Sequence, residues 1–147
     1  MRQPLLKVLK LNKSALLSKY ESEGAAGMNL RAFLDADVSV TPLGRVKIPA
    51  GLKLEIPEGY EAQVRPRSYM ALKSGFTVLN SPGTIDSDYR GGLEIIIDNL
   101  GGDNVTIKDG ERIAQLVVVP VCRAFLFEAE SIDKTQRAGT GFGSTGV

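Results

Sequence analysis

The chain has 147 residues, with 18 Lys and Arg against 17 Asp and Glu, one Cys and no His. This length fits a single domain, and the composition excludes catalytic systems and zinc sites that need His, as well as intramolecular disulfides. The net charge of +1 gives no electrostatic footprint for nucleic acid, so no nucleic-acid partner is expected.

The first predicted element is a strand around Leu5, Val8 and Leu9, where apolar and charged residues alternate. The apolar runs in this part of the chain are too short for the core of a signal peptide or for a membrane span. We therefore expect an intracellular, cytoplasmic protein without a membrane partner. Residues 14–24 are interpreted as a loop.

Three short runs of alternating apolar and polar residues follow, as is typical of half-buried strands. These runs are Val38 and Val40, then Val46 and Ile48, and then Leu52, Leu54 and Ile56. The breaks that contain Pro and Gly are Pro42–Gly44, Pro49–Gly51 and Pro57–Gly59. The pattern predicts three separate strands, each followed by a turn.

The remainder of the chain predicts one helix and two longer strands. Ser68–Ser74 has room for about two helical turns. Leu93–Ile97 and Ile113–Val121 are apolar runs that predict strands buried on both faces, and Cys122 is expected to be a small buried residue. Strands spaced about 8–12 residues apart favour a sandwich or a barrel. The sequence therefore predicts one all-β domain with one short helix.

The polar segment between Asn80 and Gly92 carries the strongest candidate for chemistry. It is interpreted as a hairpin that presents Asp86 and Tyr89. In a structural interpretation the Asp caps a turn and the Tyr covers the core. In a functional interpretation Asp86 is a general base, and Tyr89 is a flat surface for a ring or a sugar.

Three further features leave the same choice open. Ser68 is either an ordinary N-cap of the short helix or, together with Arg67, part of an anion site. Gln115 interrupts an apolar run and needs a partner from the protein or from a ligand, because an unpaired buried amide costs a few kcal/mol. The glycine-rich tail, residues 131–147, is either a frayed terminus or a segment that wraps phosphate with help from Arg137.

Five motifs, in their order along the chain, resemble those of the trimeric dUTPases, the deoxyuridine triphosphate nucleotidohydrolases. The motifs are Ala26–Ala32, Pro66–Lys73, Gly83–Gly91, Gly110–Leu116 and Arg137–Gly146. The resemblance implies a jelly-roll-like (β-clip) domain over residues 1–130 and a flexible C-terminal arm over residues 131–147. It also implies a homotrimer in which each site takes its third motif from one chain, its first, second and fourth from another, and the arm from the last.

The reaction implied by the resemblance is hydrolysis of dUTP to dUMP and pyrophosphate, with Mg²⁺ held mainly by the triphosphate. Asp86 would activate the water that attacks the α-phosphate, and Tyr89 would stack on the deoxyribose. The arm would close over the uracil and the terminal phosphates. The substrate-binding residues implied by the resemblance are Arg67, Ser68, Tyr69, Asn80, Thr84, Ile85, Tyr89, Gln115, Arg137, Phe142, Gly143 and Ser144.

Four positions depart from the family pattern. Asn29 stands where the family usually has an Asp associated with the outer shell of the hydrated metal. Tyr69 replaces a small residue, and Ala138 and Thr140 replace glycines of the arm.

Two alternatives to a dUTPase are kept open by these features. One is a protein of the same fold that binds nucleotide or a protein partner with weak turnover. The other is a dCTP deaminase, a sister class whose catalytic Glu stands at the position of Ile96, two residues from Glu94.

Overall fold

Ten strands and one helix make up the fold of the chain in the computed structural model, which describes residues 3–144 and 146. In chain order the elements are β1 (Lys7–Lys10), β2 (Met28–Arg31), β3 (Val38–Val40), β4 (Arg45–Glu55), β5 (Tyr60–Arg65), α1 (Ser68–Lys73), β6 (Phe76–Val78), β7 (Gly83–Ile85), β8 (Gly92–Asn99), β9 (Val105–Ile107) and β10 (Arg112–Pro120). The predicted all-β fold with one short helix is confirmed.

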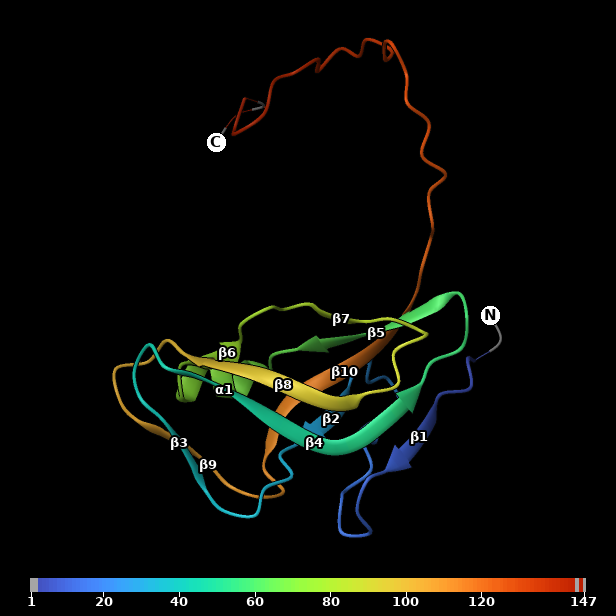
Figure 1. Ribbon diagram of the computed structural model, residues 1–147. Helices are drawn as coiled ribbons and strands as arrows, with labels where there is room; N and C mark the ends of the chain where they lie inside the picture. The colour runs from blue at the N-terminus through green and yellow to red at the C-terminus, as the bar shows by residue number, and fades with distance from the viewer. Residues whose placement is uncertain (1–2, 145, 147) are drawn as a thin grey trace.

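The strands form two antiparallel four-stranded sheets and a two-stranded ribbon (Figure 1). The first sheet has the order β1-β4-β8-β6, and the second has the order β2-β10-β5-β7. The ribbon pairs β3 with β9. Neighbours in both sheets come from distant parts of the chain, so the sheets are built mostly from long-range pairings.

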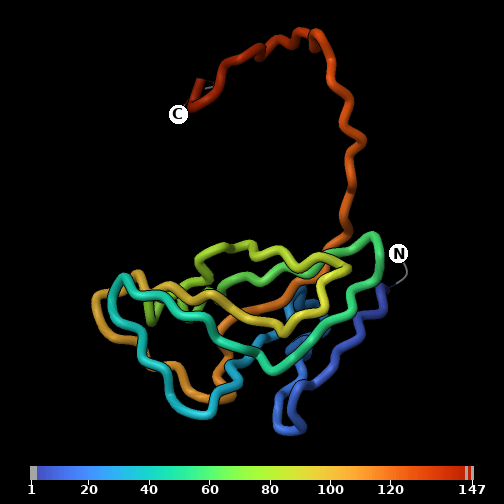
Figure 2. The backbone as a smooth tube through the Cα atoms, in the orientation of Figure 1, coloured from blue at the N-terminus to red at the C-terminus, as the bar shows by residue number. Residues whose placement is uncertain are grey.

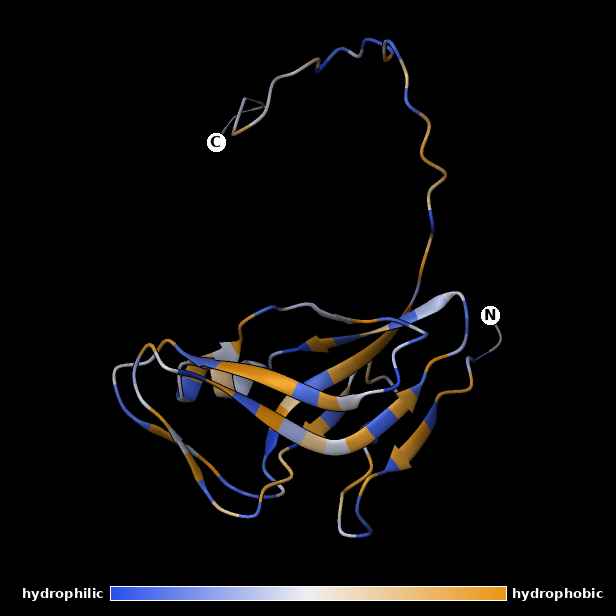
Figure 3. Cartoon of the chain, in the orientation of Figure 1, coloured by the Kyte–Doolittle hydropathy of each residue, from blue (hydrophilic) through white to orange (hydrophobic). Residues whose placement is uncertain are grey.

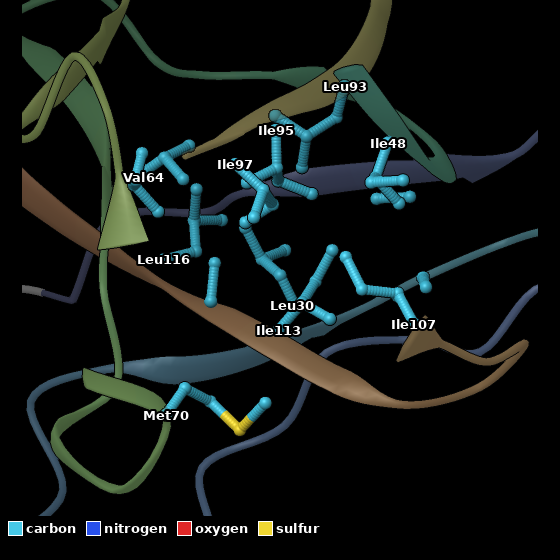
Figure 4. Close-up of a cluster of buried hydrophobic side chains, with 14 of the residues drawn as sticks. Leu30, Ile48, Val64, Met70, Leu93, Ile95, Ile97, Ile107, Ile113 and Leu116 are labelled. Atoms are coloured by element: carbon cyan, nitrogen blue, oxygen red, sulfur yellow. The ribbon is translucent and has the colours of Figure 1, made fainter. Parts of the chain in front are cut away.

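The hydrophobic core lies between the two sheets (Figure 4). Ile95 and Ile97 of β8 in the first sheet, and Leu30 of β2 and Leu116 of β10 in the second, are almost fully buried. Each buried aliphatic side chain of this size stabilises the fold by about 1.5–3 kcal/mol. The core therefore fixes which face of each strand is left for a ligand.

The expectation of two buried faces is wrong for β8. Leu93, Ile95 and Ile97 are buried, whereas Glu94 is exposed and Ile96 is only half-buried. One face of the strand packs on the core, and the other is left partly open to a pocket. Successive side chains of a strand point to opposite faces, so an uninterrupted apolar run does not require that both faces be covered.

The expected turn at residues 49–51 is also wrong, because β4 is one continuous strand. Its pairing with β8 shifts register between Pro49 and Lys53, and Gly51 has a φ of +68°. An added Cβ at Gly51 would lie 2.8 Å from the Phe33 side chain. The glycine is therefore absorbed as an irregularity within the strand, as in a β-bulge, and the chain does not reverse. Figure 3 shows the hydrophobic and hydrophilic bands that alternate along this strand.

The segment expected to be a hairpin is a crossover between the sheets. Its first strand, β7, pairs with β5 of the second sheet. The next strand, β8, pairs with β4 and β6 of the first sheet. Asp86 and Tyr89 therefore lie on the connection that passes from one sheet to the other.

The chain leaves the sheets after Pro120, and the described part of the remaining segment extends away from them (Figures 1 and 2). This point precedes residue 131, where the arm was expected to begin. Cys122 is exposed, so its expected burial is wrong. No helix among the described residues is long and apolar enough to cross a membrane.

Candidate active site

Asp86 directly follows β7 and begins a tight turn that its own segment holds together. The backbone N–H of Tyr89 donates to the Asp86 carbonyl oxygen at 3.2 Å. The Tyr89 hydroxyl donates to the carbonyl oxygen of Gly92 at 3.1 Å, and Arg90 donates to the Ser87 carbonyl oxygen at 2.7 Å. These bonds fix the direction of the segment, while the Asp86 side chain stays exposed.

A pocket of about 270 Å³ opens beside Asp86 and is built from both sheets. Its lining residues are Thr84, Ile85, Asp86 and Tyr89 from the crossover, Gly92, Glu94 and Ile96 from β8, and Lys47 from β4. This volume lies at the small end for ligand pockets, so it suits one part of a ligand, such as a base with its sugar. Four of the candidate site residues are thus brought together here.

A wider hollow of about 960 Å³ is also lined by Asp86. Its charged lining is dominated by carboxylates, namely Glu55, Glu58, Glu61, Asp86 and Asp88, against Arg90 and Arg123. A surface of this charge repels phosphate. The smaller pocket is therefore the better candidate for nucleotide, although the other is larger.

An ion pair forms part of the wall of the smaller pocket. The Nζ of Lys47 lies 2.8 Å from Oε2 of Glu94. The hydrogen bond and charge of Glu94, with a smaller contribution from Tyr89, raise the pKa of Lys47 above its ordinary value. The Glu94 carboxylate is thus paired with Lys47. The next residue on the same face of β8 is the apolar Ile96.

The second group of candidate residues surrounds the end of β5 and the middle of β10. Nε2 of Gln115 donates to the Pro66 carbonyl oxygen at 2.9 Å, which answers its need for a partner, and Gln115 stands opposite Asn29 across the β2–β10 pair. A Cβ on Gly27 would overlap the Gln115 side chain. Only glycine therefore leaves Gln115 in its place.

The short helix does not begin as the sequence suggested. Its N-cap is Arg67, with no side-chain capping bond, so Ser68 is the first helical residue and its interpretation as an N-cap is wrong. Ser68 and Tyr69 are both exposed. Arg67 reaches across to β10, where its Nη1 donates to the carbonyl oxygen of Arg112 at 3.0 Å.

Arg67, Arg31 and Arg112 make this second group strongly cationic, and we call these three residues the arginine cluster. Burial, followed by the charges of Arg112 and Arg31, lowers the pKa of Arg67, while Glu21 acts in the opposite direction. Arg31 and Arg112 face each other across the β2–β10 pair. A bound anion would relieve the repulsion among these guanidinium groups, so the cluster is suited to phosphate.

The two groups lie at opposite ends of β5. Ile85, just before Asp86, pairs with Ala62 near the start of β5, whereas Arg67 follows its end. Six residues of extended chain separate the position opposite Asp86 from Arg67, which corresponds to roughly 20 Å. Within one chain, therefore, the carboxylate and the arginine cluster do not meet.

The remaining candidates lie apart from both groups. Asn80 lies beside Gly83 at the far end of β7, where its Nδ2 is 3.1 Å from a Cβ built on that glycine, and it does not line the pocket with Asp86. In the extended tail, Nε of Arg137 donates to the Thr140 carbonyl oxygen at 3.0 Å, and Phe142 is fully exposed.

The other tail residues form turns of their own. The Ser144 backbone N–H donates to the carbonyl oxygen of Gly141 at 3.1 Å, and Gly143 has a φ of +88°. Ala138 adopts a φ of +48°, where a glycine would be less strained. Thr145, within the fifth motif, lies outside the described residues.

Sequence reasoning missed Lys47, Arg31, Arg112 and Glu21. Arg31 lies in the first motif and Arg112 in the fourth, but only the pairing of β2 with β10 shows that they are neighbours. Lys47 and Glu21 carried no sequence signal, because isolated charges in a strand or a loop are usually solvated.

Known proteins resemble the chain over almost its full length. A sequence model of the dUTPase family matches residues 13–146. A protein named deoxyuridine 5′-triphosphate nucleotidohydrolase from Hydrogenobaculum sp. (strain Y04AAS1) is 51% identical over 142 residues, which cover 97% of this chain and 98% of that protein. Its namesake from Rhizobium etli (strain CIAT 652) is 50% identical over 149 residues, covering 99% and 96% of the two chains.

Solved structures share the fold. The Staphylococcus bacteriophage 80alpha dUTPase with dUpNHpp superposes with a TM-score of 0.88 at 27% identity, over 97% of this chain and 99% of that one. This agreement over nearly every residue confirms the expected fold class.

Proposed function

The chain belongs to the dUTPase family, and we propose that it hydrolyses dUTP to dUMP and pyrophosphate at sites shared between the subunits of a homotrimer. The activity rests on the family and on the relatives, which are named for this reaction. The chain matches these relatives over nearly their whole length. The assignment of roles to residues and the trimer come from the motif resemblance, and the separation of the two groups of site residues in this chain supports a site shared between subunits.

The single observation that carries the shared site is the separation of Asp86 from the arginine cluster. A general base must lie within hydrogen-bond reach of the water that attacks the phosphorus, and phosphate ligands must contact oxygens of the same phosphate chain. Roughly 20 Å of β5 separates the two groups in one chain. A second copy that presents its arginine cluster to the Asp86 of the first would complete the site.

On the side of Asp86, the small pocket would receive the nucleoside. Tyr89, half-exposed and anchored through its hydroxyl, offers its ring to the deoxyribose. Thr84 and Ile85 line the pocket, and their backbone would hydrogen-bond the uracil, with Asn80 supporting the segment from beside Gly83. The Asp86 carboxylate would then take a proton from water as that water attacks the α-phosphate.

On the side of the arginine cluster, Gln115, Ser68 and the backbone N–H of Tyr69 would hold phosphate oxygens. One N–H of the Gln115 amide donates to the Pro66 carbonyl oxygen, so the second N–H of the same nitrogen is the donor that Gln115 could offer to a phosphate oxygen. Arg67 supplies a charge whose burial and like-charged neighbours favour an incoming anion.

Magnesium fits this site as part of the substrate. Among the described residues no group of three or more His, Cys, Asp or Glu could hold a metal ion by itself, whereas Mg²⁺ prefers oxygen ligands and commonly uses substrate phosphates with one or two carboxylates. The Asp86 carboxylate of one subunit and the amide oxygen of Asn29 of another are oxygen atoms that could face the waters bound to the ion. When bound, the ion would neutralise charge that develops on the phosphates.

The arm would complete the site from another subunit. The apolar residues of this segment are all more than four-fifths exposed, namely Phe125, Leu126, Phe127, Ile132 and Phe142. An apolar segment of this kind is normally covered by a partner. Docking on a neighbouring subunit would let Phe142 cover the uracil and bring Arg137, Gly143 and Ser144 to the terminal phosphates.

The geometry does not favour deamination. The position of the deaminase Glu is occupied by Ile96, and Glu94 is paired with Lys47. A binding protein with weak turnover is disfavoured too, because an exposed Asp86 held at a nucleoside-sized pocket serves water activation and has no role in binding alone.

A panel of nucleotides tests the proposed function. We expect pyrophosphate release from dUTP with Mg²⁺, with kcat/KM at least about 100-fold lower for dTTP, dCTP and UTP. A close fit around uracil would exclude the thymine methyl, and stacking of Tyr89 on the deoxyribose would leave no room for a 2′-hydroxyl. Cytosine has an acceptor at N3 and a donor at N4, where uracil has a donor at N3 and an acceptor at O4. Ammonia release from dCTP, or binding of dUpNHpp without turnover of dUTP, would contradict the proposal.

A further inference from the structure

Glu21 brings a carboxylate to the arginine cluster. It lies in the loop of residues 11–27, and its Oε1 accepts a hydrogen bond from Nδ2 of Asn29 at 3.2 Å. The same oxygen is 4.0 Å from Nη1 of Arg112. Its other oxygen is 3.9 Å from Nζ of Lys19. The hydrogen bond from Asn29 therefore anchors this exposed side chain, and two cations lie at the edge of ion-pair range.

The two charged side chains that contact this carboxylate, Lys19 and Arg112, are both positive. Arg31 and Arg112 act on Arg67 in one direction, and Glu21 acts on it in the other, so the carboxylate lies close enough to affect the residue proposed to meet phosphate. No function assigned above uses Glu21 directly. Its placement means that an anion drawn to three arginines also meets one negative charge.

A metal-free triphosphate and its magnesium complex experience this charge differently. The free triphosphate brings its full negative charge, which the Glu21 carboxylate repels. The complex carries two fewer negative charges and presents a cation, with its bound waters, to which a carboxylate is attractive. A carboxylate within an otherwise cationic cluster therefore weakens binding of the first form more than of the second.

We propose that Glu21 is a specificity-determining residue that makes the arginine cluster prefer the divalent-metal complex of the nucleotide over the metal-free nucleotide. This inference rests on the proposed function and refines it, since it specifies which form of the substrate the site selects. Asn29 is the positioning residue, because its amide donates the hydrogen bond that holds Glu21 in place. An Asp at position 29 would repel Glu21 and would itself supply the negative charge.

The test measures the affinity for dUpNHpp by calorimetry, once with saturating Mg²⁺ and once with EDTA. In Glu21→Gln, binding of the metal-free analogue is expected to tighten about three- to tenfold, with less than about a twofold change in the presence of Mg²⁺. Glu23→Gln is the matched control, since Glu23 is an exposed Glu of the same loop, and its preference for the metal complex should equal that of the wild type. The double variant Glu21→Gln/Asn29→Asp, which restores one carboxylate, should restore the preference.

An unchanged ratio of the two affinities in Glu21→Gln would overturn the inference. An equal loss of affinity with Mg²⁺ and with EDTA would overturn it too, because it would indicate a structural role for Glu21. These outcomes are distinct from failure of the proposed function. In that case the wild type itself neither binds dUpNHpp nor hydrolyses dUTP, and the inference falls with it.

Discussion

Replacing Asp86 by Asn is expected to lower kcat for dUTP by about three orders of magnitude while dUpNHpp still binds. The substitution keeps the size of the side chain and its place at the start of the turn, but an amide cannot accept the proton of the attacking water. The bonds that hold the segment, from Tyr89 and Arg90, do not involve the carboxylate. Steady-state kinetics and calorimetry on the same preparation separate turnover from binding.

Asp88→Asn is the matched control for this variant. Asp88 is exposed on the same connection, two residues further on, and it lines the wide carboxylate-rich hollow but not the nucleoside-sized pocket. Its kcat should stay within about threefold of the wild type. If Asp86→Asn retained full kcat, the base would be assigned to the wrong residue.

Truncation after Gln136 is expected to leave a folded trimer whose kcat/KM for dUTP is lower by about 100-fold. The deletion removes Arg137, Phe142, Gly143 and Ser144, which are exposed and lie in the tail that extends away from the sheets (Figure 1). It retains the exposed apolar residues 125–127, which we expect to bind the neighbouring subunit. Sedimentation and circular dichroism would report the assembly and the fold, and steady-state kinetics the activity.

Phe142→Ala in the full-length chain is the finer companion to this truncation. It removes only the ring proposed to cover the uracil, so it should reproduce part of the loss without affecting the assembly. Full activity of the truncated protein would exclude the arm from the site. A truncated protein that fell apart into monomers would show that the deleted residues hold the trimer together.

The sequence predicted the fold class because local patterns and turn residues report on strands directly. It misjudged β8, since the run Leu93–Ile97 is equally compatible with one buried face or two. The open face is the one that lines the pocket, and no local pattern distinguishes a face left free for a ligand from one covered by protein. The sequence did not predict that β4 continues through Pro49–Gly51, for a related reason. Glycine and proline occur at β-bulges as well as in turns.

The motif resemblance implied the residues of the site and their division between chains, but not where they lie in the fold. It assigned Asp86 and Arg67 to different chains, and the pairing of β7 with β5 adds that within one chain they lie at opposite ends of one strand. Pairing partners are chosen by long-range packing, about which a short segment carries no information. The same limit hid Arg31 and Arg112, whose proximity depends on the register of β2 against β10.

Complementation between two inactive variants tests the shared site most directly. Asp86→Asn and Gln115→Ala would be assayed alone and after exchange of subunits, with the composition of the mixed trimers measured by native mass spectrometry. If Asp86 of one subunit works with Gln115 of another, an equal mixture should recover about a quarter of the wild-type activity, because that fraction of sites has both residues intact. No recovery in verified mixed trimers would show that both residues of a site come from the same chain, and it would contradict the account.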